Sequence, residues 1–249
     1  MAITRRPRRP GPRRHDASRP RDRTAGVRAT TLAGARKAVA EVSRRLASAK
    51  MVPATAGNVS VRVGDLVAIT PTGANLAELT AAQVSVVDFE GRLVHGDLEP
   101  SSELGLHLGI YREHGAGAVV HTHAPASTAV ASVLDELPCI HYAMLGFGGA
   151  VPVAPYATYG SADLAANVVT ALAGRRATLM ASHGAITYGP TLAKAFEAME
   201  LLEWACDLYL RTLPLGAPRV LTAEQTAAVV TTSRERQYGT IRKVPKPRR

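Results

Sequence analysis

The sequence predicts an α/β protein in which helices pack on a mixed, largely antiparallel central sheet. Strand-like and helix-like segments alternate along the chain, and tight turns join several of the early strands. Because a tight turn joins antiparallel neighbours, these turns disfavour a doubly wound parallel sheet. With 249 residues, of which 46% are hydrophobic, the chain can bury the core of one large domain or two small ones.

The first part of the chain predicts one helix and two strand pairs. Apolar residues recur at spacings of three and four over residues 32–46, as in an amphipathic helix. Valines alternate in NVSVRV (58–63), and a Gly-Asp turn leads to the apolar run LVAIT (66–70), which predicts a hairpin. A Glu-Gly turn inside VSVVDFEGRLVHG (84–96) predicts a second pair of strands.

The remainder predicts helices that alternate with buried strands. The segment SSELGLHLGIYREH (101–114) begins with two serine caps and carries Leu104, Leu108 and Tyr111 on one face of a helix. The later predicted elements are the strand AVVHTH, a helix in APASTAVASVL, a strand in AVPVAPYATYGS, a helix in SADLAANVVTALAG, the strand ATLMASHG, the long helix TLAKAFEAMELLEWACDLYLRTL, and a last helix over residues 223–235.

Basic residues concentrate at the two ends of the chain. Residues 1–30 carry a net charge of +8 and residues 234–249 a net charge of +6, so the 203 residues between them carry −4. Residues 1–28 are rich in Arg and Pro and nearly lack large apolar side chains, so we expect residues 1–30 to form a disordered, solvated tail. A nucleic-acid arm is the alternative, but no aromatic residues for base stacking interleave with the arginines. We expect a folded domain over residues 31–233 and a second basic tail over residues 234–249.

The cysteines and the apolar segments bear on the location of the protein. Cys139 and Cys206 lie far apart and predict neither a disulfide framework nor a thiolate metal site. No apolar segment follows the basic N-terminus as it would in a secretory signal, and no run approaches the ~18 apolar residues of a membrane span. We therefore expect a cytoplasmic protein with no membrane partner.

Three histidines stand at the ends of predicted strands. His121 and His123 are two residues apart at the end of AVVHTH, so they point to the same side. Such a pair either binds a metal or forms a hydrogen-bonded polar strand end. His183 ends the strand ATLMASHG and supplies a third imidazole if that strand neighbours AVVHTH. Three histidines with a vacant position are typical of a catalytic divalent metal, usually zinc, although imidazole also suits manganese, cobalt and nickel.

Polar groups that suit an anion occur in loops elsewhere in the sequence. Glu103 follows two serines at a predicted helix start, where an acid favours the helix dipole and needs no other role. The same helix N-terminus, flanked by hydroxyls, also suits an anion. Two small polar loops offer further N–H and O–H groups, from Thr55, Gly57, Asn58, Thr72 and Gly73. Each loop alone fits an ordinary turn, and the chain has no Walker loop and no GxGxxG motif.

Taken in order, these motifs resemble the class II aldolase and adducin superfamily, in particular its members of the fuculose-phosphate aldolase type. The resemblance covers residues 31–239 and rests on TAGNVSVR, ITPTG, PSSE, VVHTHAPASTAVA, CIHY, PYATYGS and ATLMASHGAI. It implies a three-layer αβα catalytic domain and a homotetramer with metal sites between subunits. It also implies one Zn²⁺ per subunit on His121, His123 and His183, with Mn²⁺ or Co²⁺ as alternatives. Glu103 would be a fourth ligand at rest and the proton-transferring group in turnover.

The resemblance also implies a substrate and a reaction. The substrate phosphate would be held by Thr55, Gly57, Asn58, Thr72, Gly73, Ser101 and Ser102. Tyr142 and Tyr238 would act in the site of a neighbouring subunit. The enzyme would cleave or form a ketose 1-phosphate at its C3–C4 bond, with dihydroxyacetone phosphate and an aldehyde as the other partners. The divalent cation would stabilise the enediolate.

Other functions share this scaffold. A pentulose-phosphate 4-epimerase, a sugar-phosphate dehydratase and a decarboxylase are the alternative enzymes, although the epimerases usually carry Asp where Glu103 stands. A metal-free, adducin-like interaction module would lack the histidines and the phosphate loops, and all are here. The chain departs from the family at Leu104, where a large aromatic is common, at Ser182, where a second histidine is common, and in the loop AMLGFGG. These changes touch the aldehyde side and leave the substrate open.

Overall fold

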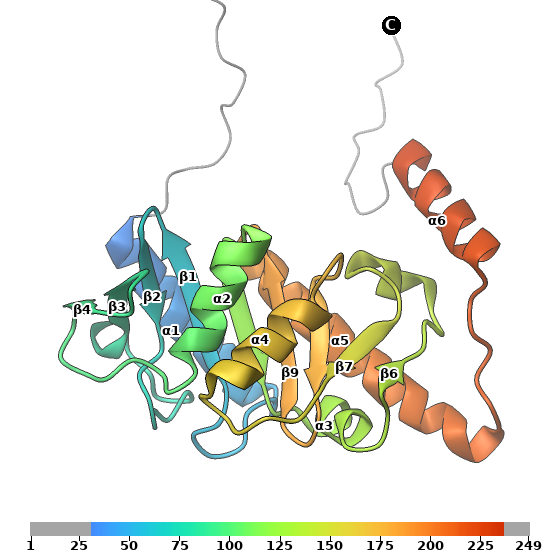
Figure 1. Cartoon of the computed structure of the whole chain (residues 1–249), viewed down its shortest axis with the longest axis horizontal. Helices are drawn as coiled ribbons and strands as arrows, with labels where there is room; N and C mark the ends of the chain where they lie inside the picture. The colour runs from blue at the N-terminus through green and yellow to red at the C-terminus, as the bar shows by residue number, and fades with distance from the viewer. Residues whose placement is uncertain (1–30, 237–249) are drawn as a thin grey trace, which may run out of the picture.

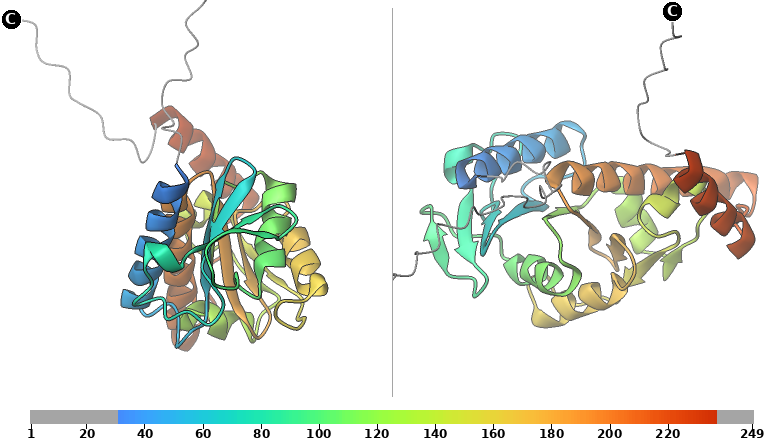
Figure 2. Two further views of the ribbon diagram at one scale, coloured as in Figure 1. Left: turned by 90° about the vertical axis from the view of Figure 1, so that its left-hand side faces the viewer. Right: turned by 90° about the horizontal axis from the view of Figure 1, so that it is seen from above.

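The structure, a computed structural model, describes residues 31–236, which form three layers with helices on both faces of one sheet (Figures 1 and 2). The predicted three-layer α/β fold is thus confirmed. Residues 1–30 and 237–249 lie outside the described residues; they include the predicted N-terminal tail, most of the predicted C-terminal tail, and Tyr238. Within residues 31–236, no helix has the length and apolar character needed to cross a membrane.

The central sheet has nine strands in the described part of the chain. They are β1 (Asn58–Val63), β2 (Leu66–Ile69), β3 (Ser85–Asp88), β4 (Leu93–His95), β5 (Ala118–Thr122), β6 (Glu136–Leu137), β7 (Val151–Ala154), β8 (Ala177–Met180) and β9 (Gly184–Gly189). Their order in the sheet is β4-β3-β2-β1-β5-β9-β8-β7-β6. Only β7 and β8 pair in parallel among these neighbours, so the sheet is mixed and largely antiparallel.

Helices cover both faces of this sheet. They are α1 (Leu32–Ser48), α2 (Leu104–His114), α3 (Pro125–Ala131), α4 (Ala162–Ala171), α5 (Leu192–Thr212) and α6 (Ala223–Arg236), with the short 3₁₀ helices η1 (Ala81–Gln83), η2 (Tyr142–Gly146) and η3 (Leu213–Leu215). Helices α1 and α5 lie on one face and α2 and α4 on the other (Figure 2). Thr31, Ser161 and Thr191 cap α1, α4 and α5, because each side chain accepts a hydrogen bond from an N–H three residues ahead. Helix α6 buries none of its residues and stands away from the layers (Figure 1).

The two faces of β1 serve different purposes. Val59 and Val61 point into the larger apolar core, which the sheet forms with α1 and α5. Asn58 and Ser60, which alternate with them, are buried on the opposite side and form hydrogen bonds with residues of α2 or its N-cap. The strand therefore carries polar side chains into the interior on the α2 side, and these groups need partners there.

The strand β9 was not predicted. The segment ATLMASHG is not one strand, because β8 ends at Met180 and the chain turns through residues 181–183 before β9 begins at Gly184. Strand β9 then lies between β5 and β8, so the strand that precedes His183 does not neighbour AVVHTH. A side chain at Gly184 would overlap the carbonyl oxygen of Thr122, so glycine permits this close approach of β9 to β5.

The start of α2 also differs from the prediction. Its N-cap residue is Glu103, and no serine hydroxyl caps the helix. Instead the Ser101 hydroxyl accepts a hydrogen bond from the Glu103 N–H at 3.2 Å, while the Leu104 N–H donates to the Ser101 carbonyl at 2.9 Å. These bonds close a tight turn in front of the helix and hold the buried Glu103 side chain at the edge of the sheet.

Candidate metal centre

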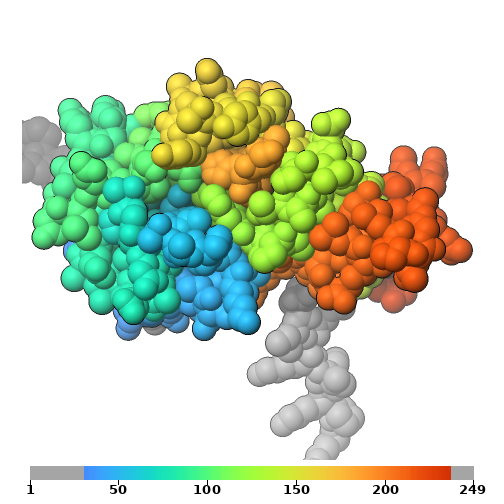
Figure 3. Space-filling model, turned by 90° about the horizontal axis from the view of Figure 1, so that it is seen from below, coloured from blue at the N-terminus to red at the C-terminus, as the bar shows by residue number. Residues whose placement is uncertain are grey.

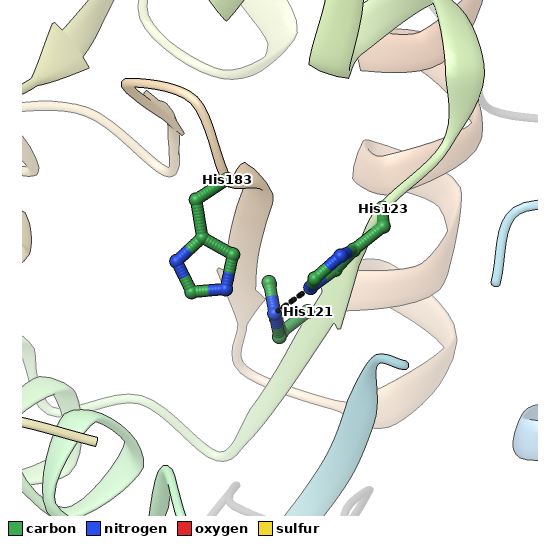
Figure 4. A group of neighbouring side chains, drawn as sticks. All are labelled: His121, His123 and His183. Atoms are coloured by element: carbon green, nitrogen blue, oxygen red, sulfur yellow. Dashed lines mark hydrogen bonds between the residues drawn. The ribbon is translucent and has the colours of Figure 1, made fainter. Parts of the chain in front are cut away.

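Four predicted site residues meet at one edge of the sheet. His121 is the fourth residue of β5, and His123 follows directly after that strand. His183 comes from the turn between β8 and β9, and Glu103 from the N-terminus of α2. Figure 4 shows the three imidazoles facing one another, two from the end of β5 and one from the turn before β9. The antiparallel pairing of β5 with β9 makes this possible, because it places the start of β9 beside the end of β5.

The three imidazole rings form a nearly equilateral triangle. Their centroids lie 4.8 Å apart for His121 and His123, 5.0 Å for His121 and His183, and 4.9 Å for His123 and His183. One nitrogen from each ring lies within 4.8 Å of the other two. Three nitrogen ligands at this spacing can bind a single cation at their centre.

The hydrogen bonds of His121 determine which of its nitrogens faces the cluster. Its Nδ1–H donates to the carbonyl oxygen of Ala185 at 2.9 Å, so the lone pair of the neutral ring is on Nε2. That Nε2 lies 3.0 Å from Nε2 of His123 and 3.1 Å from Oε2 of Glu103. Electron pairs of three groups thus converge on one point, and such an arrangement requires a proton or a cation there.

Glu103 completes the cluster. Its Oε2 accepts a hydrogen bond from the Asn58 amide at 2.8 Å. Its Oε1 lies 3.3 Å from Nε2 of His183 and is buried, but it has no hydrogen-bond partner within residues 31–236. A buried carboxylate oxygen without a hydrogen bond is costly, and a cation would satisfy it. This orphaned oxygen and the three converging imidazoles fit a divalent metal.

The protonation states also fit a cation. Burial opposes ionisation of the Glu103 carboxyl, but attraction to His121 and hydrogen bonds from His121 and Asn58 outweigh it, so its pKa lies below the usual range. Burial, aided by the charge of His121, lowers the pKa of His123 and of His183 to about 4. Burial would also lower the pKa of His121, but the Glu103 carboxylate outweighs it and raises that pKa. The proton held there must leave when a cation binds.

A cavity of about 500 Å³ opens beside the four groups. Its lining includes every predicted phosphate residue, namely Thr55, Gly57, Asn58, Thr72, Gly73, Ser101 and Ser102. Figure 3 looks onto this edge of the molecule, where segments from distant parts of the sequence lie side by side. Gly57 has a φ of +82°, and a Cβ there would lie 3.0 Å from the His121 carbonyl oxygen, so its loop can pack directly on β5.

Of the two predicted tyrosines, only Tyr142 lies among the described residues, and it does not line this cavity. Tyr142 lies on η2, is 44% exposed, and borders a different hollow beside α6. Tyr238 lies outside the described residues. Their predicted action in the site of a neighbouring subunit stays a prediction.

Several residues of the site were not predicted from the sequence. Tyr156, Tyr159 and Ser182 line the cavity, and both tyrosines are more than 60% exposed. They lie in PYATYGS and ASHG, motifs that pointed to the family but not to these individual side chains. His107, which is fully buried, donates a hydrogen bond to Asn58. Its spacing of four residues from Glu103 on the predicted helix was the available signal.

Comparisons with known proteins identify relatives of this chain. Residues 37–210 match the family described as the Class II Aldolase and Adducin N-terminal domain. The chain is 36% identical over 215 residues to the 5-methylthioribulose-1-phosphate/5-deoxyribulose-1-phosphate aldolase of Rhodospirillum rubrum, with 85% of this chain and 96% of the relative covered. It is 41% identical over 178 residues to the L-fuculose phosphate aldolase of Escherichia coli K12, with 71% and 82% covered. A solved L-fuculose 1-phosphate aldolase superposes with a TM-score of 0.77 at 33% identity, covering 80% of this chain and 96% of that chain.

Proposed function

Because the chain belongs to the class II aldolase and adducin family, we propose that it is a metal-dependent aldolase that cleaves a ketose 1-phosphate. In the cleavage direction the C3–C4 bond breaks, the C4 hydroxyl loses its proton as an aldehyde forms, and C3 gains a proton to give dihydroxyacetone phosphate. The observation that carries this proposal is the convergence of three imidazoles and a buried carboxylate beside a cavity lined by small polar loops.

The metal would be held by His121, His123 and His183, with Glu103 as a fourth ligand at rest. Zinc is the proposed ion, one per subunit, because three histidines with a further position are typical of catalytic zinc, and Mn²⁺ and Co²⁺ are the alternatives. When bound, a divalent cation supplies positive charge that stabilises the negative charge developing on the substrate oxygens.

Glu103 would move the proton at C3. The carboxylate is ionised near neutral pH, because its pKa lies below the usual range, and it lines the cavity. A general base must lie within hydrogen-bond reach of its proton. Oε1 of Glu103 accepts no hydrogen bond within residues 31–236, so it would be able to take the proton once Glu103 is displaced from the cation. In synthesis the carboxylate would remove a proton from C3, and in cleavage the protonated carboxyl would give a proton to C3.

The substrate phosphate would lie against the small polar loops that line the cavity. There Thr72 and Ser102 present exposed hydroxyls, whereas the Glu103 and Leu104 N–H groups at the start of α2 already donate to Ser101. Gly73 has a φ of +67°, so its loop adopts a turn that side chains rarely tolerate. None of the predicted phosphate residues is a lysine, so hydroxyl and backbone groups would bind the phosphate.

We expect the double replacement Thr72→Ala and Ser102→Ala to weaken phosphate binding selectively. Loss of two hydrogen bonds to a charged group should raise KM for the ketose 1-phosphate by at least about tenfold. The rate with the non-phosphorylated ketose should change less than twofold, as steady-state kinetics on both substrates would show. Thr170→Ala, an exposed hydroxyl on α4 outside this cavity, is the matched control. If the wild type turned over the ketose and its 1-phosphate equally well, these loops would not bind phosphate.

A substrate panel tests the proposed reaction. L-Fuculose 1-phosphate, 5-deoxyribulose 1-phosphate and 5-methylthioribulose 1-phosphate share the 1-phosphate end and differ in the aldehyde that leaves. We expect release of dihydroxyacetone phosphate from at least one of them, and loss of that release after chelation of the metal. An assay coupled to glycerol-3-phosphate dehydrogenase measures the dihydroxyacetone phosphate released. Interconversion of 4-epimers without free triose would favour an epimerase, and no reaction with any member would contradict the proposal.

The predicted homotetramer and cytoplasmic location belong to this proposal. In a tetramer, Tyr142 and Tyr238 would complete the site of a neighbouring subunit, which accords with the position of Tyr142 outside the cavity of its own chain. Light scattering on the purified protein should give a mass of four chains. A monomer that is fully active would contradict this part of the proposal.

A further inference from the structure

A chain of four buried polar side chains leads away from Glu103 into the interior. The Asn58 amide donates to Glu103 Oε2 at 2.8 Å, and Asn58 Oδ1 lies 2.5 Å from Nε2 of His107. On the other side of that ring, Nδ1 lies 2.7 Å from the Ser60 hydroxyl, which lies 2.6 Å from the Tyr111 hydroxyl. Two of these groups come from β1 and two from α2.

The direction of each hydrogen bond follows from the one before it. The Glu103 carboxylate only accepts, so Asn58 must turn its NH₂ towards it and its carbonyl oxygen towards His107. That oxygen only accepts, so His107 must carry its proton on Nε2 and leave Nδ1 as an acceptor. The Ser60 hydroxyl then donates to Nδ1, and the Tyr111 hydroxyl donates to Ser60. Every member is satisfied in only one arrangement.

Burial keeps the side chains of this hydrogen-bond chain uncharged. His107 and Ser60 have no exposed surface, and Tyr111 has 1%. Burial and the charge of His121 lower the pKa of His107 to about 3, so the ring is neutral when the enzyme works. The side chains packed nearby on this side of the sheet are apolar, including Val119, Ile110 and Ile186. An apolar set of similar volume could fill the same space without needing mutual hydrogen bonds.

We propose that His107 is a positioning residue for Glu103: together with Ser60 and Tyr111 it fixes the Asn58 amide so that Oε2 is tied and Oε1 is left to take the proton. The inference rests on the proposed function, because it assigns an atom to the proton transfer. If Asn58 turned over, its carbonyl oxygen would face the carboxylate and repel it. The Nε2–H of His107 prevents this, because it can donate to a carbonyl oxygen but not to an NH₂ group.

Two amide substitutions at position 107 separate this role from a packing role. In His107→Gln the side-chain NH₂ reaches the place of Nε2 and can donate to Asn58. In His107→Asn the shorter amide reaches only the place of Nδ1, so it keeps the contact with Ser60 and loses the one with Asn58. Both put an amide into the same buried space. We expect His107→Asn to lower kcat about 10–100-fold with KM within twofold, and His107→Gln to regain kcat to within about threefold of the wild type. Metal content should stay near one ion per chain in both.

The outcomes distinguish the two roles. Equal loss of kcat in both variants, in step with a fall in melting temperature, would mean that His107 only packs and would overturn the inference. Wild-type kcat in His107→Asn would overturn it as well. Nitrogen-15 spectra of the wild-type imidazoles give an answer that needs neither folding of a variant nor turnover. We expect His107 as the neutral Nε2–H tautomer from pH 6 to 8, and an Nδ1–H tautomer would contradict the proposal. If the wild type cleaves no ketose 1-phosphate, the proposed function fails, whereas this spectrum still tests the orientation of Asn58.

Discussion

Replacing His121 with alanine should remove the bound cation and nearly all activity. His121 is fully buried, and its Nε2 lies close to both His123 and Glu103, so two imidazoles and an unbalanced carboxylate would remain. Loss of a catalytic cation removes the main stabilisation of developing charge, so we expect kcat to fall by at least about 10³-fold, or about 4 kcal/mol. Elemental analysis after gel filtration, together with kinetics, measures both effects.

Two further variants make the His121 result interpretable. His183→Ala removes a partly exposed ligand, and it should also lose the ion while keeping the melting temperature of the metal-free wild type within a few degrees. His95→Ala removes an exposed histidine of β4 outside the site, and it should keep one ion and full activity. Full metal and full activity in His121→Ala would refute the metal centre.

Replacing Glu103 with glutamine should abolish proton transfer while the fold persists. Glutamine has nearly the same shape, but an amide cannot accept the C3 proton, so the chemical step should slow by roughly 10²–10⁴-fold. KM should change less than threefold, because the predicted phosphate loops are untouched. Stopped-flow or steady-state kinetics with the best ketose 1-phosphate measures this split. Glu99→Gln, an exposed acid shortly before the same helix, is the matched control and should behave as the wild type.

A different result for Glu103→Gln would show that the carboxylate binds the metal but does not transfer the proton. Its Oε2 accepts from Asn58 and contacts His121, so a glutamine there could disturb both neighbours. If kcat fell only as far as metal content fell, and if added zinc restored it, Glu103 would be a metal ligand and not the proton-transferring group.

Local patterns were enough to predict most of the fold. Apolar spacing located α1, and alternating valines with a Gly-Asp turn located the β1–β2 hairpin. Strand β9 was missed because only three residues separate it from β8. Ser182 in that turn has a φ of +50°, and a serine in the sequence does not predict a positive φ. The predicted family and its class of enzyme are confirmed by the family match and by relatives that are aldolases.

Local sequence patterns alone predicted only part of the site, and the resemblance to the family supplied the rest. His121 and His123 share one strand, so their common direction follows from the alternation of side chains. His183 joins them through β9, a pairing that no local pattern shows. The chain of hydrogen bonds that links Glu103 to Tyr111 could not be predicted for the same reason, because it crosses repeatedly between α2 and β1. The only local signal was the spacing of four residues between Glu103, His107 and Tyr111.

The central claim is that Glu103 exchanges a proton with C3 of dihydroxyacetone phosphate next to a metal bound by three histidines. Deuterium exchange at C3 tests it directly, because the exchange needs no aldehyde and no bond between carbons. In D₂O, proton spectra of dihydroxyacetone phosphate with the zinc-loaded wild type should show one C3 hydrogen replaced, and chelation or Glu103→Gln should slow the replacement by at least about 10²-fold. No exchange with the zinc-loaded wild type, or exchange at the wild-type rate in Glu103→Gln, would contradict the account.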